Sequence, residues 1–505
     1  MKQCVHILFC VILAVGAGSC NKFLDVKPKG KLIPSEVADF DHLLDNTNIA
    51  QWVFLDNNTG CNLGYLTDNL YLSDGIGNIN YKANNHPNID RYWAYIFRQP
   101  YKNPATSDYF WDWGTYRSMA YFNNVIDGIR GIPNLSPENQ QYAKRVVAQA
   151  LVDRAWSYFI TTLVYGPVYK PGAANDTKTI PYVISSDVGA PMPDLSTQAE
   201  AFRKVAADVY IALPDIPDVT NWPSRPNKTA AQALMAYYHL FTQRYDSVVY
   251  YANLAWTAAS AGGVDKLIYD YNTFSWTDPT NLVNSTIKAP DNFLSAANSR
   301  ETLLYRNIDA GAGRSSSSYP SDEIIALYDQ ANDLRFKYFF LTAPGYKTTY
   351  NGTTYDDGNR TQYYRGSKTT MTAGFTYPEL LLMRAEGYAR TNRLAEAVND
   401  LNTLRRYRYK TGIPLLSGGS QDEVIQMVLD ERRRELPLGS FKRFLDLKRF
   451  CLEAGKPWAK AKIKHQIGTA AYEGTVDSKD FILTISNPVL KFNPQWNIPL
   501  DGRPF

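Results

Sequence analysis

Two stretches of the chain carry a repeated pattern that limits what it can fold into. Residues 229–260 and 376–408 each contain two apolar-periodic segments joined by a short polar turn. Apolar residues that recur at three- and four-residue steps are typical of an α-helix with one buried face. Each stretch therefore predicts a pair of helices, and the chain as a whole is expected to be mainly α-helical.

The two helical pairs also share the placement of a small residue and a turn. Ala236 and Arg244 in the first pair have the same spacing as Ala385 and Arg393 in the second. A small residue at this place lets paired helices approach closely, which is the pattern of tetratricopeptide-type repeats. Because the match is looser than the full repeat signature, two unrelated helical hairpins remain an alternative.

A third long helix is expected over residues 142–166. Val147, Leu151, Ala155 and Phe159 follow one another at four-residue steps, and Gly166 then ends the pattern. This spacing predicts an amphipathic helix. The other segments are richer in Asn, Gly, Pro and aromatic residues. One domain over residues 20–505 is expected, with a loop-rich part (20–110), helical pairs (111–261), an irregular insertion (262–345) and a last helical pair with the C-terminal part (346–505).

The N-terminus has the composition of an export signal. Lys2 is followed by an apolar run over residues 5–15, and small residues precede Cys20. Residues 1–19 are therefore predicted to be a lipoprotein signal peptide and Cys20 the lipid anchor. A secreted protein with a cysteine at this place by chance is the alternative. A lipid of several chains holds a protein stably at a membrane, so the body of the chain is expected to be tethered there and to work in water.

Few residues are arranged for catalysis or metal binding. The five histidines include no pair at metal-ligand spacing, and no phosphate-binding glycine loop or nucleophile motif occurs. Glu431 and Glu435 share a helical face but have arginines between them, which favours ion pairs over a glycosidase pair. We therefore expect no enzyme activity, catalytic residue, cofactor or metal. One disulfide, between Cys61 and Cys451, is an alternative that the sequence leaves undecided.

The composition favours an aromatic binding surface over a nucleic-acid one. A net charge of +4 is no signature of nucleic-acid binding, whereas aromatic residues make up 13% of the chain and include 36 tyrosines. A sugar ring needs an aromatic platform and polar groups for its hydroxyls. Two regions offer both. The platform candidates are Tyr81, Tyr92, Trp93 and Tyr95 in the first region and Tyr271, Phe274 and Trp276 in the second; the polar candidates are Asp74, Asn78, Arg91, Asp270 and Asn272.

Four stretches together resemble the SusD/RagB family of outer-membrane nutrient-binding lipoproteins. They are Cys20 with the following FLDVKPKG, RAWSYFITTLVYGPV at 154–168, YPELLLMRAEGYARTNRLAEAVNDLNTLRRYR at 377–408, and DERRRELPLGSFKRFLDLKRF at 430–450. The resemblance implies a right-handed superhelical scaffold of tetratricopeptide-like pairs, with long irregular loops that carry the ligand face. It also implies a glycan ligand, a SusC-type TonB-dependent transporter as partner, and an outward-facing place at the outer membrane.

Four functions follow as hypotheses from the residues and the resemblance. The leading one is capture of an oligo- or polysaccharide at the cell surface and delivery to the transporter. The alternatives are the same fold with a peptide or other nutrient as ligand, a lipid-anchored glycoside hydrolase, and a helical scaffold that binds only protein. The resemblance also implies that an early and a later aromatic loop converge to build the glycan platform, which fits the positions of the two aromatic regions.

Overall fold

The computed structural model describes residues 34–46, 62–108, 110–290, 292–307, 316–363 and 372–505. Cys20 and Cys61 lie outside these ranges, so the lipid anchor and a pairing of Cys61 with Cys451 stay predictions. Within the described ranges, no helix combines the length and the apolar character needed to cross a membrane.

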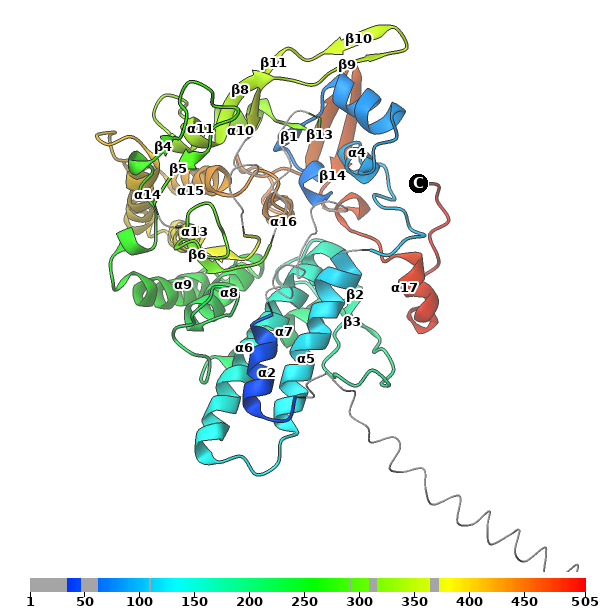
Figure 1. Cartoon of the computed structure of the whole chain (residues 1–505), viewed down its shortest axis with the longest axis vertical. Coiled ribbons are helices and arrows are strands. Elements are labelled where there is room, and N and C mark those ends of the chain that lie inside the picture. The colour runs from blue at the N-terminus through cyan, green and yellow to red at the C-terminus, as the bar shows by residue number, and fades with distance from the viewer. Residues whose placement is uncertain (1–33, 47–61, 109, 291, 308–315, 364–371) are drawn as a thin grey trace, which may run out of the picture.

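Helices form the lower and left parts of the molecule (Figure 1). Neighbours in sequence pack against each other, as α6 does with α7 and α8 with α9. The longer helices are α2 (Val37–Leu44), α5 (Arg117–Arg130), α6 (Pro137–Tyr165), α7 (Gln198–Ala212), α8 (Lys228–Phe241), α9 (Tyr245–Ser260), α13 (Tyr377–Arg390), α14 (Leu394–Arg408), α15 (Gln421–Glu435) and α16 (Lys442–Phe450). Shorter ones are α4 (Ile89–Tyr95), α10 (Asp322–Ala326), α11 (Leu334–Phe339) and α17 (Asn487–Phe492).

The two predicted helical pairs are confirmed and have the same turn. Both α8 and α13 are 14 residues long. In each turn one residue has a positive φ, 52° at Gln243 and 60° at Asn392, two positions after the last helical residue. Ala236 and Ala385 are both fully buried, as expected where two helices pack closely. The fold is thus mainly α-helical with tetratricopeptide-like pairs.

Helix α6 differs from the prediction in length and surroundings. It begins at Pro137, after a Ser136 side chain that accepts a hydrogen bond from the Asn139 backbone N–H. Its second half is buried on every side, including Asp153 and Arg154. The prediction of an amphipathic helix is therefore wrong for this half, because α5, α7 and the C-terminal part surround it instead of solvent.

Short antiparallel ribbons fill most of the upper part of the molecule, while β2 and β3 lie lower, beside α5 and α7 (Figure 1). Each described ribbon has two strands, and several join segments that are far apart in sequence. The pairs are β1 (Leu70–Tyr71) with β7 (Tyr319–Pro320), β2 (Lys178–Pro181) with β3 (Leu195–Thr197), β4 (Ser275–Trp276) with β5 (Ile287–Lys288), β6 (Thr302–Leu304) with β12 (Phe375–Thr376), β8 (Phe340–Pro344) with β11 (Asn359–Tyr363), β9 (Lys347–Tyr350) with β10 (Thr353–Asp356), and β13 (Lys462–Ile467) with β14 (Ala470–Thr475).

One large hydrophobic core connects these parts. It extends from Val37 in α2 to Trp496 near the C-terminus and includes residues from all four expected segments. The ribbons are therefore fixed to the helical scaffold through shared buried side chains, which gives the loops between them defined positions.

Candidate functional site

A cavity of about 750 Å³ lies where four distant segments meet. The volume falls in the range of about 300 to 1,000 Å³ that is usual for small-molecule sites. Its walls come from β1, from β7 with the start of α10, from β11 and from the β13–β14 hairpin. The lining residues include Asp68, Leu70, Tyr71, Tyr95, Tyr319, Asp322, Glu323, Asn359, Arg360, Lys464, His465 and Gln466.

Tyr71 is a half-buried aromatic residue of this cavity. In β1 it lies between the buried Leu70 and Leu72, so the strand directs their side chains inward and that of Tyr71 outward. Its partner across the ribbon is Tyr319. Burial raises the pKa of the Tyr71 hydroxyl, while the nearby positive charge of Arg360 opposes the shift. The hydroxyl therefore stays protonated at neutral pH and can both donate and accept a hydrogen bond.

Asp357 connects three segments next to the cavity. Its Oδ2 accepts hydrogen bonds from the Ser73 hydroxyl at 2.7 Å and from the Tyr319 hydroxyl at 2.8 Å. The Tyr319 oxygen in turn accepts a bond from the backbone N–H of Tyr346 at 2.7 Å. These bonds hold the β9–β10 arm and the start of β11 against β1, which brings Arg360 to the cavity.

The inner wall contains a buried carboxylate that is fully paired. Asp68 makes ion pairs with Arg443 at 2.7 Å, Lys460 at 2.6 Å and Arg433 at 3.2 Å. Burial alone would raise the pKa of Asp68, but the three cations hold it well below its ordinary value. Asp68 thus fixes the wall as a permanent anion and has little capacity left for a ligand.

The exposed side chains at the rim are those with capacity for a ligand. Asp322, Asn359, Arg360 and Gln466 line the cavity and are exposed to solvent. They offer a carboxylate, two amides and a guanidinium around the Tyr71 ring. An aromatic face bordered by such donors and acceptors is suited to a ligand with an apolar face and a hydroxylated edge.

The first predicted region lies beside this cavity, but most of its rings are buried. Tyr81 and Tyr92 have 0% and 2% of their surface exposed, and Tyr95 has 1% because it stacks on His465 at 4.0 Å. Trp93 is half-buried beneath the Arg98 guanidinium, which lies 4.0 Å from the ring centre. Only Tyr95 of these rings lines the cavity.

The polar residues of the first region are engaged in local structure. Asp74 accepts a hydrogen bond from the Asn78 amide at 2.6 Å within the π-helical segment η2 (Gly75–Ala83). Arg91 is buried with its guanidinium over the Tyr65 ring.

The second predicted region is also mostly part of the core. Tyr271 is fully buried under the Arg408 guanidinium, and Phe274 is 5% exposed. Trp276 is half-buried against Tyr338.

The polar residues of the second region make local contacts as well. The Asp270 side chain accepts from the Asn272 backbone N–H at 2.9 Å, and the Asn272 amide donates to the Tyr409 carbonyl at 2.9 Å. Both residues thus fix the short turn that precedes β4.

The two regions do not converge, which corrects the expectation that they build one platform. The second packs against α11 and α14, whereas the first packs against the β13–β14 hairpin through His465. In Figure 1, β4 and α4 accordingly lie on opposite sides of the upper part of the molecule. Five of the seven proposed rings have no free face because they fill the core.

Tyr71 and Arg360 were missed because their neighbours in space are distant in sequence. The segments around Tyr71, Tyr319 and Arg360 meet only through the β1–β7 and β8–β11 ribbons. The local signal that was available is the alternation of Leu70, Tyr71 and Leu72, which is typical of a strand with Tyr71 on the outer face.

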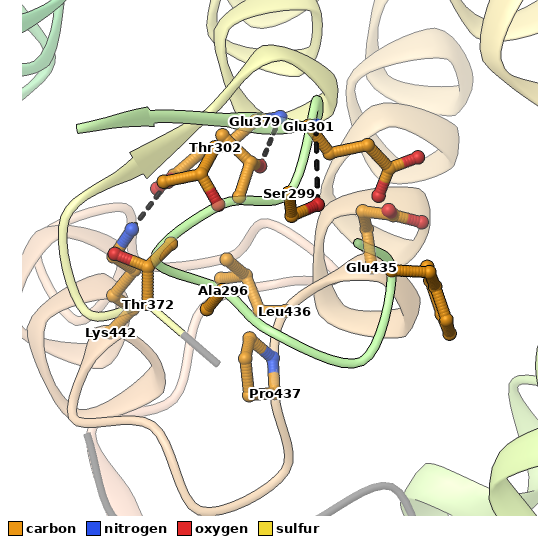
Figure 2. A pocket seen from close by; sticks show the side chains of 12 residues that line it. Ala296, Ser299, Glu301, Thr302, Thr372, Glu379, Glu435, Leu436, Pro437 and Lys442 are labelled. Atoms are coloured by element: carbon orange, nitrogen blue, oxygen red, sulfur yellow. Dashed lines mark hydrogen bonds and ion pairs between the residues drawn. The ribbon is translucent and has the colours of Figure 1, made fainter. Parts of the chain in front are cut away.

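A second cavity, drawn in Figure 2, contains three carboxylates but little space. It is lined by Glu301, Glu379 and Glu435 and has a volume of about 40 Å³, enough for a few water molecules and too small for a sugar ring. Glu379 is paired with Lys442, and Glu301 with Arg408 at 2.8 Å. These carboxylates are engaged in ion pairs within the protein and therefore do not form a substrate site.

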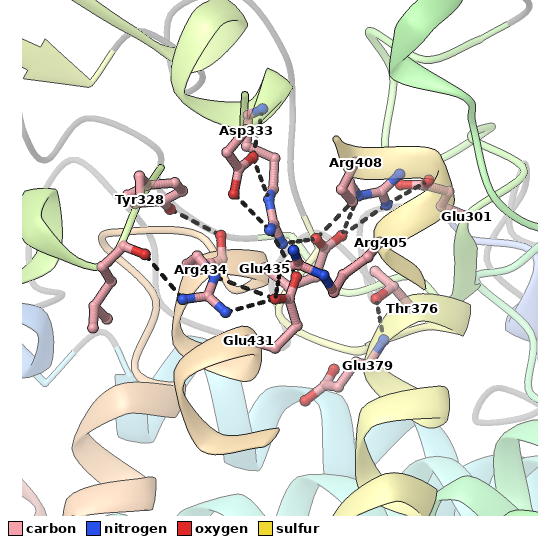
Figure 3. Close-up of polar contacts among 12 residues, drawn as sticks. Glu301, Tyr328, Asp333, Thr376, Glu379, Arg405, Arg408, Glu431, Arg434 and Glu435 are labelled. Atoms are coloured by element: carbon pink, nitrogen blue, oxygen red, sulfur yellow. Dashed lines mark hydrogen bonds and ion pairs between the residues drawn. The ribbon is translucent and has the colours of Figure 1, made fainter. Parts of the chain in front are cut away.

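Glu431 and Glu435 belong to the buried ion-pair network in Figure 3. Arg335 contacts Glu431 at 2.7 Å and Glu435 at 2.9 Å, while Arg408 contacts Glu435 at 2.8 Å. Burial would raise the pKa of Glu431, but Arg335 and Arg434 lower it to about 2. The prediction that these glutamates form ion pairs is confirmed, with Arg335 and Arg408 from other segments as partners besides Arg434.

Comparison with protein families covers nearly the whole chain. Residues 235–499 match the family model described as "SusD family", and residues 22–240 match the one described as "Starch-binding associating with outer membrane". No curated protein matches.

Solved structures share the fold at low sequence identity. A SusD superfamily protein from Bacteroides thetaiotaomicron has a TM-score of 0.66 at 17% identity, with 93% of this chain and 100% of that chain covered. A SusD-like carbohydrate binding protein from Bacteroides vulgatus has a TM-score of 0.62 at 15% identity, with coverages of 91% and 97%. A SusD superfamily protein from Bacteroides fragilis has a TM-score of 0.63 at 16% identity, with coverages of 92% and 100%. The chain belongs to the SusD family.

Proposed function

We propose that the chain captures an oligo- or polysaccharide in the Tyr71 cavity without cleaving it. The observation that supports this most is the half-buried Tyr71 ring in a cavity of about 750 Å³ with exposed Asp322, Arg360 and Gln466 at its rim. The ring offers an apolar face for the C–H groups of a pyranose, and the rim offers partners for its hydroxyls. The name of the carbohydrate binding protein from Bacteroides vulgatus points to the same class of ligand.

We further propose that capture serves uptake through the outer membrane. The description of the N-terminal family model, "associating with outer membrane", supports this location, and the resemblance of the chain implies a SusC-type TonB-dependent transporter as partner. In this proposal Cys20 carries the lipid and the body of the chain faces outward.

Isothermal titration of a soluble form that begins after Cys20 tests the ligand class. Plant, host and microbial polysaccharides are titrated in turn, and released sugars are assayed in the same samples. Saturable binding without released sugar is expected. Released sugar would favour the glycoside hydrolase, and no binding to any glycan would contradict the proposal.

Tyr71→Ala tests the place of the site. Loss of a stacking aromatic ring is expected to raise Kd about two- to tenfold, since such a contact contributes about 0.5 to 1.5 kcal/mol. Tyr250→Ala is the matched control, because Tyr250 is 59% exposed on α9 outside the cavity. Trp93→Ala and Trp276→Ala test the two predicted platform rings that are only half-buried, and loss of binding in Trp276→Ala alone would move the site to β4.

A peptide or other nutrient is the second candidate ligand. It is favoured by the burial of Tyr81, Tyr92, Tyr95, Tyr271 and Phe274, which leaves few aromatic faces for a long glycan. A ligand recognised mainly by Asp322, Arg360 and the other rim groups would lose little affinity in Tyr71→Ala.

A further inference from the structure

The β9–β10 hairpin carries tyrosines on one of its two faces. It projects at the top edge of the molecule, beyond β8 and β11 (Figure 1). Its register places Tyr350 opposite Thr353, and Tyr355 follows Thr353 by two residues on the same strand. Because side chains alternate along a strand, Tyr350 and Tyr355 share a face and are diagonal neighbours, about 7 to 8 Å apart. Thr349 belongs to the other face, whose residues are all exposed.

Neither Tyr350 nor Tyr355 is used by the rest of the fold. Both are half-buried, but neither packs against the hydrophobic core, whereas Tyr346 at the base of the hairpin does. Among the described residues, neither ring stacks on another ring and neither hydroxyl has a hydrogen-bond partner. Tyrosine combines an apolar ring with a polar hydroxyl, so two such rings on a projecting hairpin are suited to contact a ligand.

The tyrosine face of the hairpin leads into the Tyr71 cavity. Asp357 follows Tyr355 by two residues, and its backbone N–H still donates across the hairpin, to the Tyr346 carbonyl at 3.0 Å. The Asp357 carboxylate accepts a hydrogen bond from the Tyr319 hydroxyl at 2.8 Å. Tyr319 lines the cavity and lies directly opposite Tyr71 in the β1–β7 ribbon, so the two rings share a side of that ribbon. A row of tyrosines thus extends from the cavity onto the hairpin.

Contacts with η2 give the hairpin a defined position. A Cβ atom at Gly75 would lie 3.1 Å from the Tyr346 ring and 3.4 Å from the Tyr355 Cβ atom, so this glycine lets the hairpin approach closely. The Tyr346 hydroxyl also donates to the Asn80 side chain at 3.4 Å. A surface that is already in place loses less conformational freedom when a ligand binds.

We propose that Tyr350 and Tyr355 form an outer subsite for a saccharide chain whose inner units occupy the Tyr71 cavity. This inference rests on the proposed function, because it extends the site of the same ligand. The strand from Asp357 back to Thr353 adds about 14 Å of surface to the cavity, and Thr353 supplies an exposed hydroxyl on the tyrosine face. The extended site therefore favours a saccharide chain over a single sugar or a disaccharide.

The dependence of affinity on chain length tests this proposal. Malto-, xylo- and chito-oligosaccharides, from the disaccharide to the octasaccharide, are titrated into the soluble form that begins after Cys20. Isothermal titration follows the long chains and ligand-observed NMR the short ones. In a series that binds, the wild-type Kd is expected to fall as the chain lengthens. Tyr350→Ala and Tyr355→Ala should each raise the Kd of the octasaccharide about two- to tenfold and leave that of the disaccharide unchanged, whereas Tyr71→Ala should raise both.

Two further variants separate the ring from the hairpin that carries it. Thr349→Ala is the matched control on the opposite face, and no change in either Kd is expected. Tyr355→Phe keeps the ring and should retain most of the affinity for the octasaccharide.

The outcomes distinguish this inference from the proposed function. Equal Kd values for short and long chains, or equal octasaccharide binding by the wild type and both alanine variants, would overturn the outer subsite and leave the Tyr71 cavity as the site. Loss of disaccharide binding in Tyr350→Ala and Tyr355→Ala would also overturn it, because the hairpin would then support the cavity without contacting the outer units. No binding by any series would contradict the proposed function together with the inference.

Discussion

His239 is a buried histidine whose titration can be predicted from its contacts. Its Nδ1 lies 3.3 Å from the Thr242 hydroxyl, and its Nε2 is buried without a hydrogen-bond partner among the described residues. Burial, together with the positive charge of Arg244, lowers the pKa of His239 to about 4. The folded protein therefore keeps the ring neutral at pH values where the unfolded chain, with a pKa near 6.5, takes up a proton.

The free energy of unfolding is accordingly expected to fall as the pH decreases from about 6.5 toward 4. His239→Phe keeps the ring that stacks on Tyr251 but removes the titrating group. Urea unfolding at pH 7, 6 and 5 should show a steeper loss of stability in the wild type than in the variant. Parallel pH profiles would contradict the assigned pKa.

The dual character of the tyrosine side chain explains why the site residues were hard to predict. Tyrosine has an apolar ring and a polar hydroxyl, so it suits both a core and a binding surface. Tyr81 stands between Asn80 and Lys82 and Tyr71 between Leu70 and Leu72, yet the first is fully buried and the second half-buried. The alternation around Tyr71 is a local signal, whereas the burial of Tyr81 depends on the packing of distant segments.

At the element scale, helix α15 is held by buried ion pairs whose loss is expected to be costly. Glu435 is buried between Arg335 and Arg408, so Glu435→Gln leaves two buried guanidinium groups with less compensation. Removing one partner of a buried ion pair costs about 3 to 5 kcal/mol. Chemical unfolding should show a loss of this size. Glu396→Gln is the control, since Glu396 pairs with Arg393 at the surface, and no measurable change is expected.

The elements themselves were largely predictable because their signals are local. The pairs α8–α9 and α13–α14 follow from apolar periodicity and from a polar turn that ends one helix and begins the next. The ribbons were not predictable in the same way. Pairing of Leu70 with Pro320 joins residues 250 positions apart, and no short pattern encodes such a contact. The surroundings of α6 were missed for the same reason, because its burial depends on the C-terminal part.

At the scale of the whole molecule, the helical scaffold provides stability and the ribbons form the proposed binding site. The scaffold supplies most of the shared core, and β1, β7, β11 and β13 line the Tyr71 cavity. A ligand in that cavity should contact all four segments at once.

Hydrogen exchange with and without a bound glycan tests the central claim most directly. A glycan found by titration is added to the soluble form, and exchange is followed in peptides across the chain. Protection is expected together in the segments around Tyr71, Asp322, Arg360 and Gln466, with the β4–β5 ribbon unchanged. Protection confined to residues 270–288, or to the outer helices α7 and α9, would contradict the Tyr71 cavity as the binding site.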